Sequence, residues 1–406
     1  MTLRSGNPGR GAVLMLVTLI AAAAIYLVLG LVSSLSWDGP GWARDGEQPI
    51  GRDFVAFWAA ARLALDGGPG AAYDLGAIDA VETAVAQHPV NTVPWHYPPT
   101  FLLAVLPLGL LPYPLALLLW LALPTVALLA LVRRFAGPSL ALPLALVFPA
   151  TAQCLISGQN GIAFAAALLA GMLWLERRPV LAGLALSLLV CKPQLAPLLL
   201  PALAAGRHWR ALGGTIGGGL LLVAGSWLAF GTETWLIFLD QMPAAGEMLA
   251  DGAKPWPRMP TVYVAARMLG ADGAMAMLLQ GLSAVAAVAA LAWGWRRRND
   301  IGARAAVLAA AIPFATPFLF DYDLVLWILP LAWLARPWLA GEGAGRDRSG
   351  LDLSVLVLAW LGPVAGWLLG WKTGIPALPA IALLLLAAVL WRVAGTRPAG
   401  RPALAA

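Results

Sequence analysis

The sequence contains few charged residues and few residues of the kinds that hold metals. Only 11% of its 406 residues are Asp, Glu, Lys or Arg, whereas 61% are hydrophobic. That balance excludes a soluble globular protein. The two cysteines, Cys154 and Cys191, both lie in apolar stretches without metal-ligand spacing or a nearby histidine pair. We therefore expect neither metal nor redox chemistry, and no cofactor.

Apolar runs, many of them near the length that spans a bilayer, take up most of the chain. The formal net charge of +6 comes from short basic clusters between these runs, which indicates cytoplasmic loops rather than a nucleic-acid surface. The pattern predicts an all-α membrane protein, a polytopic bundle of roughly 10–13 transmembrane helices, as one integral-membrane domain over residues 1–406. The basic clusters predict cytoplasmic termini, with a cytoplasmic loop at 335–350 and a tail at 392–406.

The longest polar segment, residues 34–97, is predicted to be an outer loop with two surface helices, near 54–65 and 75–87. Apolar residues at helical spacing predict that the first of these helices is amphipathic and lies on the membrane surface. Asp53 stands at its head, where the helix dipole favours a carboxylate. The alternative is that Asp53 is only a helix cap.

Two apolar stretches do not read as simple crossings. Residues 100–131 are interrupted by Pro112-Tyr113-Pro114, so either one half is re-entrant or both halves cross the membrane. Residues 179–205 lie between two basic clusters and are predicted to enter the membrane and return, with Lys192 at the tip. A lysine at that depth requires a cavity or a counter-charge. A second outer loop is predicted at 231–260.

Polar residues from separate segments converge on the outer half of this predicted bundle: Asp53, Gln159, Asn160, Lys192, Asp321 and Asp323. Each of them alone is as well explained by satisfying a helix end, but their convergence favours a functional site. A long outer loop with helices over a multispanning bundle resembles the GT-C fold of lipid-sugar-dependent glycosyltransferases.

Five short motifs, in order, make this resemblance more specific, and each alone is weak. The chain resembles glycosyltransferase family 87, bacterial membrane mannosyltransferases that use polyprenyl-phosphate mannose, over about residues 12–335. Some members carry a histidine in the last motif, where this chain has carboxylates and a tyrosine. The motifs are Arg52-Asp53-Phe54, Tyr97-Pro98-Pro99, Gly158-Gln159-Asn160, Lys192-Pro193-Gln194 and Asp321-Tyr322-Asp323.

The resemblance implies transfer of a sugar, by the family's habit mannose, from a polyprenyl-phosphate-sugar to a lipid or glycan acceptor. The reaction is expected on the outer face of the bacterial cytoplasmic membrane, with inversion. An inverting transfer needs one general base, and Asp53 fits that role. The leaving phosphate needs cations; Lys192 is the first candidate, with Arg258 and Arg62 as weaker ones. Arg52 either keeps Asp53 ionised or binds phosphate.

The remaining candidates are expected to bind substrate. Gln159 and Asn160 suit sugar hydroxyls or phosphate oxygens, and Gln194 belongs to the lysine motif. Asp321 and Asp323 either bind sugar hydroxyls, position the acceptor, hold a divalent ion, or merely cap a helix. His96 either touches substrate or is an interface residue.

A transporter or flippase for a lipid or small solute is the alternative function, and a structural partner in cell-envelope assembly is a third. Many spans and intramembrane polar residues suit a transporter. The absence of a detectable inverted repeat and the long acidic outer loop argue against it. Transfer of labelled sugar by the purified protein would discriminate between these hypotheses.

Overall fold

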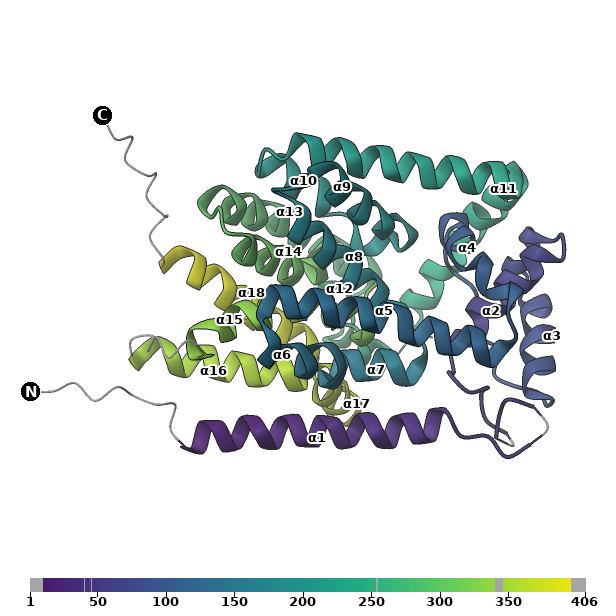
Figure 1. The fold of residues 1–406 in the computed structure, drawn as a ribbon, viewed down its shortest axis with the longest axis horizontal. Coiled ribbons are helices and arrows are strands. Elements are labelled where there is room, and N and C mark those ends of the chain that lie inside the picture. Colours follow the sequence, from purple (N-terminus) through teal and green to yellow (C-terminus); the bar gives the residue numbers. More distant parts are fainter. Residues whose placement is uncertain (1–9, 40, 45, 253–254, 340–345, 396–406) are drawn as a thin grey trace, which may run out of the picture.

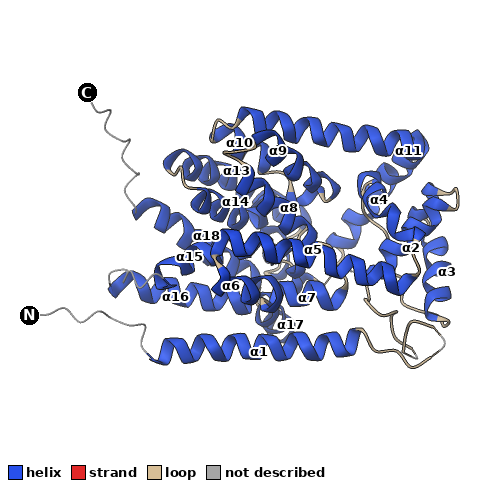
Figure 2. Ribbon diagram, viewed as in Figure 1, coloured by secondary structure: helices blue, strands red, loops and turns tan. Residues whose placement is uncertain are grey.

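The chain folds almost entirely into helices in the computed structural model, which describes residues 10–39, 41–44, 46–252, 255–339 and 346–395 (Figures 1 and 2). Within these ranges there is no strand beyond an isolated bridge between Ala43 and Pro49. The predicted class, an all-α polytopic membrane protein, is confirmed.

Six described segments are long and apolar enough to span a membrane, or seven if one bent pair counts as a single span. The described ranges also contain six shorter apolar helices of 10–17 residues. The number of described helices that are long enough to span a membrane is therefore smaller than the roughly 10–13 predicted. The six long segments are α1 (Arg10–Ser34), α5 (Tyr113–Ala136), α11 (Trp209–Ala250), α13 (Gly273–Arg297), Asp352–Thr373 and α18 (Ala377–Gly395).

The two helices predicted in the first outer loop are present as α2 (Phe54–Leu65) and α3 (Leu75–Ala86), joined by η1 (Pro69–Tyr73). They lie at the right of Figure 1, opposite the start of α1 and the end of α18. The helix at 54–65 is not apolar on one face only, and its place on the membrane surface stays a prediction. All residues of its first two turns except the half-buried Trp58 are buried, because α3, α4 (Pro99–Val105), η2 (Leu106–Leu110) and α5 pack around them.

The ambiguous stretch after residue 99 divides into a short half and a full span. α4 and η2 together cover 99–110, whereas α5 runs for 24 residues, about 36 Å at 1.5 Å per residue. Arg134, at the end of α5, lines the same cavity as Glu176 and Asp300, which adjoin two of the predicted cytoplasmic clusters. This grouping favours the alternative in which only α5 crosses.

The stretch 179–205 is a broken hairpin, as predicted. α9 (Pro179–Ser187) and η4 (Leu188–Cys191) form one leg, and η5 (Pro193–Leu195) and α10 (Leu199–Ala205) form the other. Lys192 lies at the break, with extended backbone (φ −135°, ψ 77°). The prolines on both sides of Leu195 explain why neither leg continues as an α-helix.

Two predicted loops are helical over part of their length. α11 bends at Gly231, whose φ of 75° suits glycine, and continues through Ala250, where an outer loop was predicted. η6 (Trp256–Arg258) and α12 (Val262–Met268) follow. In the predicted cytoplasmic loop, α15 (Ile328–Leu339) extends into it and α16 (Arg346–Leu361) begins within it. Residues 340–345, and 396–406 of the tail, lie outside the described ranges.

The remaining elements surround the site. α6 (Pro138–Leu142), the π-turn η3 (Pro143–Val147) and α7 (Pro149–Ser157) form the pair bent by 44°. α8 (Gly161–Trp174) and α14 (Ile301–Ala315) are short, and η7 (Asp321–Trp327) connects α14 to α15. The π-turn η8 (Gly362–Gly366) and α17 (Trp367–Thr373) complete the chain between α16 and α18.

Candidate active site

The turn between α7 and α8, Gly158 to Gly161, is the centre of the polar cluster. A Cβ at Gly158 would meet the carbonyl oxygen of Gly51 at 2.2 Å, and one at Gly161 would meet that of Tyr322 at 2.4 Å. Gly158 also has a φ of 67°. These two glycines therefore let the head of α2 approach one side of the turn and η7 approach the other. Gln159 and Asn160 lie between them.

On the α2 side, Gln159 holds the carboxylate of Asp53. The Nε2 of Gln159 donates to Oδ2 of Asp53 at 2.8 Å, and the backbone N–H of Asp53 donates to the carbonyl of Ser157 at 3.1 Å. Asp53 is half-buried, and its side chain makes no capping hydrogen bond to α2. The helix-cap alternative for Asp53 therefore does not explain where its carboxylate points.

Arg52 precedes Asp53 in a left-handed conformation with a φ of 48°, which is uncommon for a residue with a long side chain. Its side chain is exposed, and within the described ranges it forms no hydrogen bond or ion pair. Its guanidinium donors are therefore available to an anion beside Asp53.

On the other side of the turn, Lys192 is enclosed. It is 2% exposed, and it forms an ion pair with Asp323, which is 1% exposed. Its Nζ also donates to Oδ1 of Asn160 at 2.8 Å. The required counter-charge is thus present, because burial of an unpaired ammonium is costly. Asp323 additionally accepts from the N–H of Phe320 at 3.2 Å, so it caps η7 as well as pairing with the lysine.

Asp321 is held by Arg258 through two parallel bonds, 2.9 Å from Nε and 2.8 Å from Nη2. The carboxylate is fully buried, whereas the arginine side chain is 26% exposed. Burial alone lowers the pKa of Arg258, but the charge and hydrogen bonds of Asp321 outweigh burial and raise that pKa above its ordinary value. The guanidinium is therefore a fixed, permanent cation with one side open.

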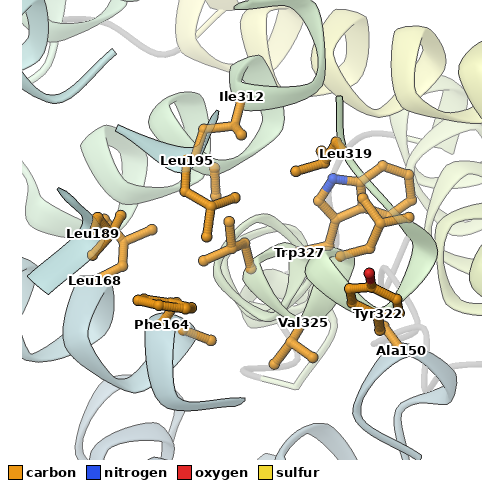
Figure 3. Packing of buried hydrophobic residues seen from close by; sticks show 14 of the residues in the cluster. Ala150, Phe164, Leu168, Leu189, Leu195, Ile312, Leu319, Tyr322, Val325 and Trp327 are labelled. Atoms are coloured by element: carbon orange, nitrogen blue, oxygen red, sulfur yellow. The ribbon is translucent and has the colours of Figure 1, made fainter. Parts of the chain in front are cut away.

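Tyr322 lies between the two cations. Its ring centroid is 5.0 Å from Nζ of Lys192 and 5.8 Å from Cζ of Arg258, within cation–π range. Figure 3 shows Tyr322 in the cluster of buried apolar residues that also contains Phe164 of α8 and Val325 and Trp327 of η7. Charges paired in such surroundings are weakly screened, so each pair is strongly coupled.

The two sides of the turn form one electrostatic unit. The charge of Asp53 acts on Arg258, and Tyr26 of α1 experiences the charges of Arg52, Arg258 and Asp321. Tyr26 also donates a hydrogen bond to Gln153 of α7. The described contacts join the same groups in a chain, from Asp53 through the adjacent Gln159 and Asn160 to Lys192, and from Lys192 through Tyr322 to Arg258.

Two candidate residues, Arg62 and Gln194, have no contact with this cluster among the described residues. Arg62, at the far end of α2, donates to the carbonyl of Gly109 and pairs with Asp66, so it anchors the helix. Gln194 is half-buried two residues beyond Lys192 and has no hydrogen bond within the described ranges. His96 is half-buried next to Tyr97. A direct role for Arg62 stays a prediction that these contacts do not favour.

Three tyrosines were missing from the sequence-based candidates. Tyr97 donates to Oε1 of Gln159 at 3.4 Å, Tyr322 lies between the two cations, and Tyr26 donates to Gln153 of α7. Tyr97 and Tyr322 stand inside quoted motifs, so the motifs carried the signal for them. A single tyrosine in an apolar helix gives no such signal, because its hydrogen-bond partner comes from α7.

The expected phosphate ligand also changes. Lys192 is already neutralised and enclosed, so it is poorly placed to contact a substrate, whereas Arg52 and Arg258 are accessible. The described residues include no group of three or more His, Cys, Asp or Glu side chains placed to hold a metal ion. Asp321 and Asp323 each face a cation instead.

A family model described as "Glycosyltransferase family 87" matches residues 95–320, more than half of the chain. The match contains Gln159, Asn160, Lys192 and Arg258, and it ends one residue before Asp321. No curated protein and no solved structure matches the chain. The chain belongs to glycosyltransferase family 87 and is a multi-pass membrane glycosyltransferase.

Proposed function

We propose that the protein transfers mannose from polyprenyl-phosphate mannose to a hydroxyl of a lipid or glycan acceptor, with inversion at the anomeric carbon. The site is proposed to face the outside of the bacterial cytoplasmic membrane, and both termini the cytoplasm. The observation that carries the proposal is the carboxylate of Asp53, which is fixed by Gln159 and accessible beside two arginines.

In this mechanism Asp53 takes the proton of the acceptor hydroxyl as its oxygen attacks the anomeric carbon. The bond between that carbon and the phosphate oxygen breaks on the opposite face, and polyprenyl phosphate leaves with two negative charges. Arg52 and Arg258 bind this phosphate, because a guanidinium matches its geometry in a bidentate manner. Gln159 keeps Asp53 oriented, which limits the geometries that the base can adopt.

Lys192 then has a supporting role. Its pairing with Asp323 and its bond to Asn160 fix η7 against the α7–α8 turn. Since the adjacent Asp321 orients Arg258, the enclosed pair holds the phosphate ligand in place through the backbone of η7. Lys192 is a positioning residue in this proposal.

The test is Asp53→Asn, which preserves the size of the side chain and its hydrogen bond from Gln159. Because an amide cannot take the proton, turnover is expected to fall by roughly 10²–10⁴-fold while donor affinity stays near wild type. The measurement is transfer of labelled mannose from polyprenyl-phosphate mannose to endogenous acceptors in membranes of known enzyme content.

Asp74→Asn is the matched control, because Asp74 is a true helix cap that accepts from the N–H of Ala77 at 2.7 Å. Asparagine caps about as well as aspartate, so this variant is expected to retain transfer. Near-normal transfer by Asp53→Asn would remove Asp53 as the base. If the wild type transferred sugar only from a different polyprenyl-phosphate sugar, that sugar and not mannose would be the donor sugar.

A further inference from the structure

A polar cavity lies at the end of the helices far from the candidate active site. It has a volume of about 410 Å³ and is bounded by the ends of α5, α8, α14 and α15. α8 begins at the α7–α8 turn and ends at this cavity, whereas α14 begins at the cavity and leads to η7. About 20 Å of helix therefore separates the two sites. It is thus independent of the site proposed above.

Two arginines face this cavity with most of their donors unused. Arg134, in the last turn of α5, is exposed and forms no hydrogen bond or ion pair within the described ranges. Arg336 donates to the carbonyl of Phe135 and lies 5.0 Å over its ring. Two guanidinium groups from different helices match the oxygens of a phosphate.

The start of α14 adds backbone donors to the same cavity. Asp300 caps the N–H of Ala303 at 2.8 Å, whereas the N–H groups of Ile301 and Gly302 have no acceptor among the described residues. A Cβ at Gly302 would meet Nη1 of Arg336 at 2.9 Å, so the glycine lets the guanidinium lie against the helix start. Helix N-termini bind anions.

The acidic groups at the cavity do not cancel these cations. Asp300 is paired with Arg298 at 3.0 Å. Glu176 is exposed, and its negative charge interacts with the buried Arg304 and with His208. Arg177 and Arg178 follow Glu176 directly. Basic residues in and around the cavity therefore outnumber its two carboxylates, because Arg134 and Arg336 line it and Arg298, Arg177 and Arg178 adjoin those carboxylates in space or in sequence.

We propose that this cavity binds the phosphate group of an anionic membrane phospholipid. The cavity lies at the end of a spanning helix, α5, whose Leu118, Leu123 and Val126 are at least 60% exposed and face lipid. A bilayer places phospholipid headgroups at that depth, and basic pockets between helix ends bind them.

The experiment measures binding of phosphatidylglycerol to the full-length protein in detergent by native mass spectrometry. Dioleoylglycerol, which lacks the phosphate, and inorganic phosphate, which lacks the chains, are the matched probes. Arg134→Ala and Arg336→Ala are each expected to weaken phosphatidylglycerol binding about tenfold or more. Arg210→Ala, an exposed arginine outside the cavity, is expected to leave it unchanged. The side chain of Arg134 makes no hydrogen bond or ion pair with the described chain, so Arg134→Ala is expected to fold. This variant therefore tests the proposal even if Arg336→Ala fails to fold.

The direction in which a third variant changes phosphatidylglycerol binding tests the charge of the ligand. Glu176→Gln removes a negative charge from the cavity, and it is expected to tighten phosphatidylglycerol binding several-fold. Weaker binding of phosphatidylglycerol in Glu176→Gln would overturn the proposal, because removal of a negative charge cannot weaken a site that attracts a phosphate by charge. Unchanged binding in Arg134→Ala, or equal binding of dioleoylglycerol, would also overturn it. If inorganic phosphate bound as tightly as phosphatidylglycerol, the ligand of the cavity would be free phosphate instead of a membrane lipid.

Discussion

Each end of the helical body contains one buried cation, and the two are satisfied in different ways. Lys192 faces the carboxylate of Asp323 and the amide of Asn160. Arg304 instead donates to the carbonyls of Trp295 and Arg298, at the end of α13, and to Nε2 of His208 at 2.8 Å. Since arginine only donates, His208 must accept and is neutral there.

The difference between the partners of Lys192 and those of Arg304 distinguishes a functional site from a helix cap. Arg304 satisfies carbonyls that α13 would otherwise leave unpaired, so the fold itself accounts for it. Lys192 satisfies no backbone group. It neutralises an acid 131 residues away, and both charges are there only because the chain brings them together. Buried charges without a backbone task are typical of functional sites.

The largest effect is expected for Lys192→Gln. This variant leaves Asp323 buried without its counter-charge, which costs about 3–5 kcal/mol. Unfolding of the purified protein in mixed detergent–SDS micelles, followed by circular dichroism, measures the loss. The double variant Lys192→Gln, Asp323→Asn removes both charges and is expected to recover most of the stability. A double variant as unstable as the single one would contradict the ion-pair account.

Arg258→Lys changes function more than stability. Lysine keeps the positive charge but cannot make the two parallel bonds to Asp321, so the cation loses its fixed direction. We expect the KM for polyprenyl-phosphate mannose to rise about tenfold with a smaller change in kcat. Arg267→Lys, at an arginine that binds the carbonyls of Ala250 and Ala271, is the matched control. Equal KM values for the two variants would argue against Arg258 as a phosphate ligand.

Arg304→Gln tests the other end of the molecule. Removal of its hydrogen bonds to the end of α13 is expected to lower the free energy of unfolding by about 1.5–3 kcal/mol. Sugar transfer per folded molecule should remain at the wild-type level, because α14 separates this residue from the cluster. A loss of specific activity beyond the loss of folded protein would show that the two ends are coupled.

The smallest effect is an opposite pH dependence at the two ends. Burial raises the pKa of Glu82, in α3, to about 8, so its contribution to stability is complete below its ordinary 4.5 and is lost as pH rises through 8. Burial and then Arg304 lower the pKa of His208 below 6.5, so its contribution is complete above 6.5 and is lost as pH falls.

Glu82→Gln should therefore remove a loss of stability that develops as pH rises from about 4.5 to about 8, whereas His208→Gln should remove a loss that develops as pH falls below 6.5. Glutamine keeps an acceptor for Val93 in the first case and for Arg304 in the second. Unfolding midpoints between about pH 5 and about pH 9 measure both effects. A curve for Glu82→Gln that falls with rising pH as steeply as that of the wild type would contradict the assigned direction.

The sequence alone determined the class, the broken hairpin and the family. Hydropathy is a local property, since each span must satisfy its backbone within itself, so composition was enough to predict an all-α membrane protein. The prolines and Lys192 marked the break in the hairpin. The short polar motifs contain most residues of the cluster, because the same short segments supply both the turns and the side chains.

Only the tertiary structure decided which residues are partners. Arg258 and Asp321 are 63 residues apart, and nothing local to either of them predicts their pairing. The same holds for Lys192, which the sequence suggested as a phosphate ligand and which packing enclosed against Asp323. Charge and residue type can be read from the chain, but exposure depends on segments that fold over a residue from elsewhere. That is why the accessible cations are Arg52 and Arg258, and why Arg62 lies apart from them.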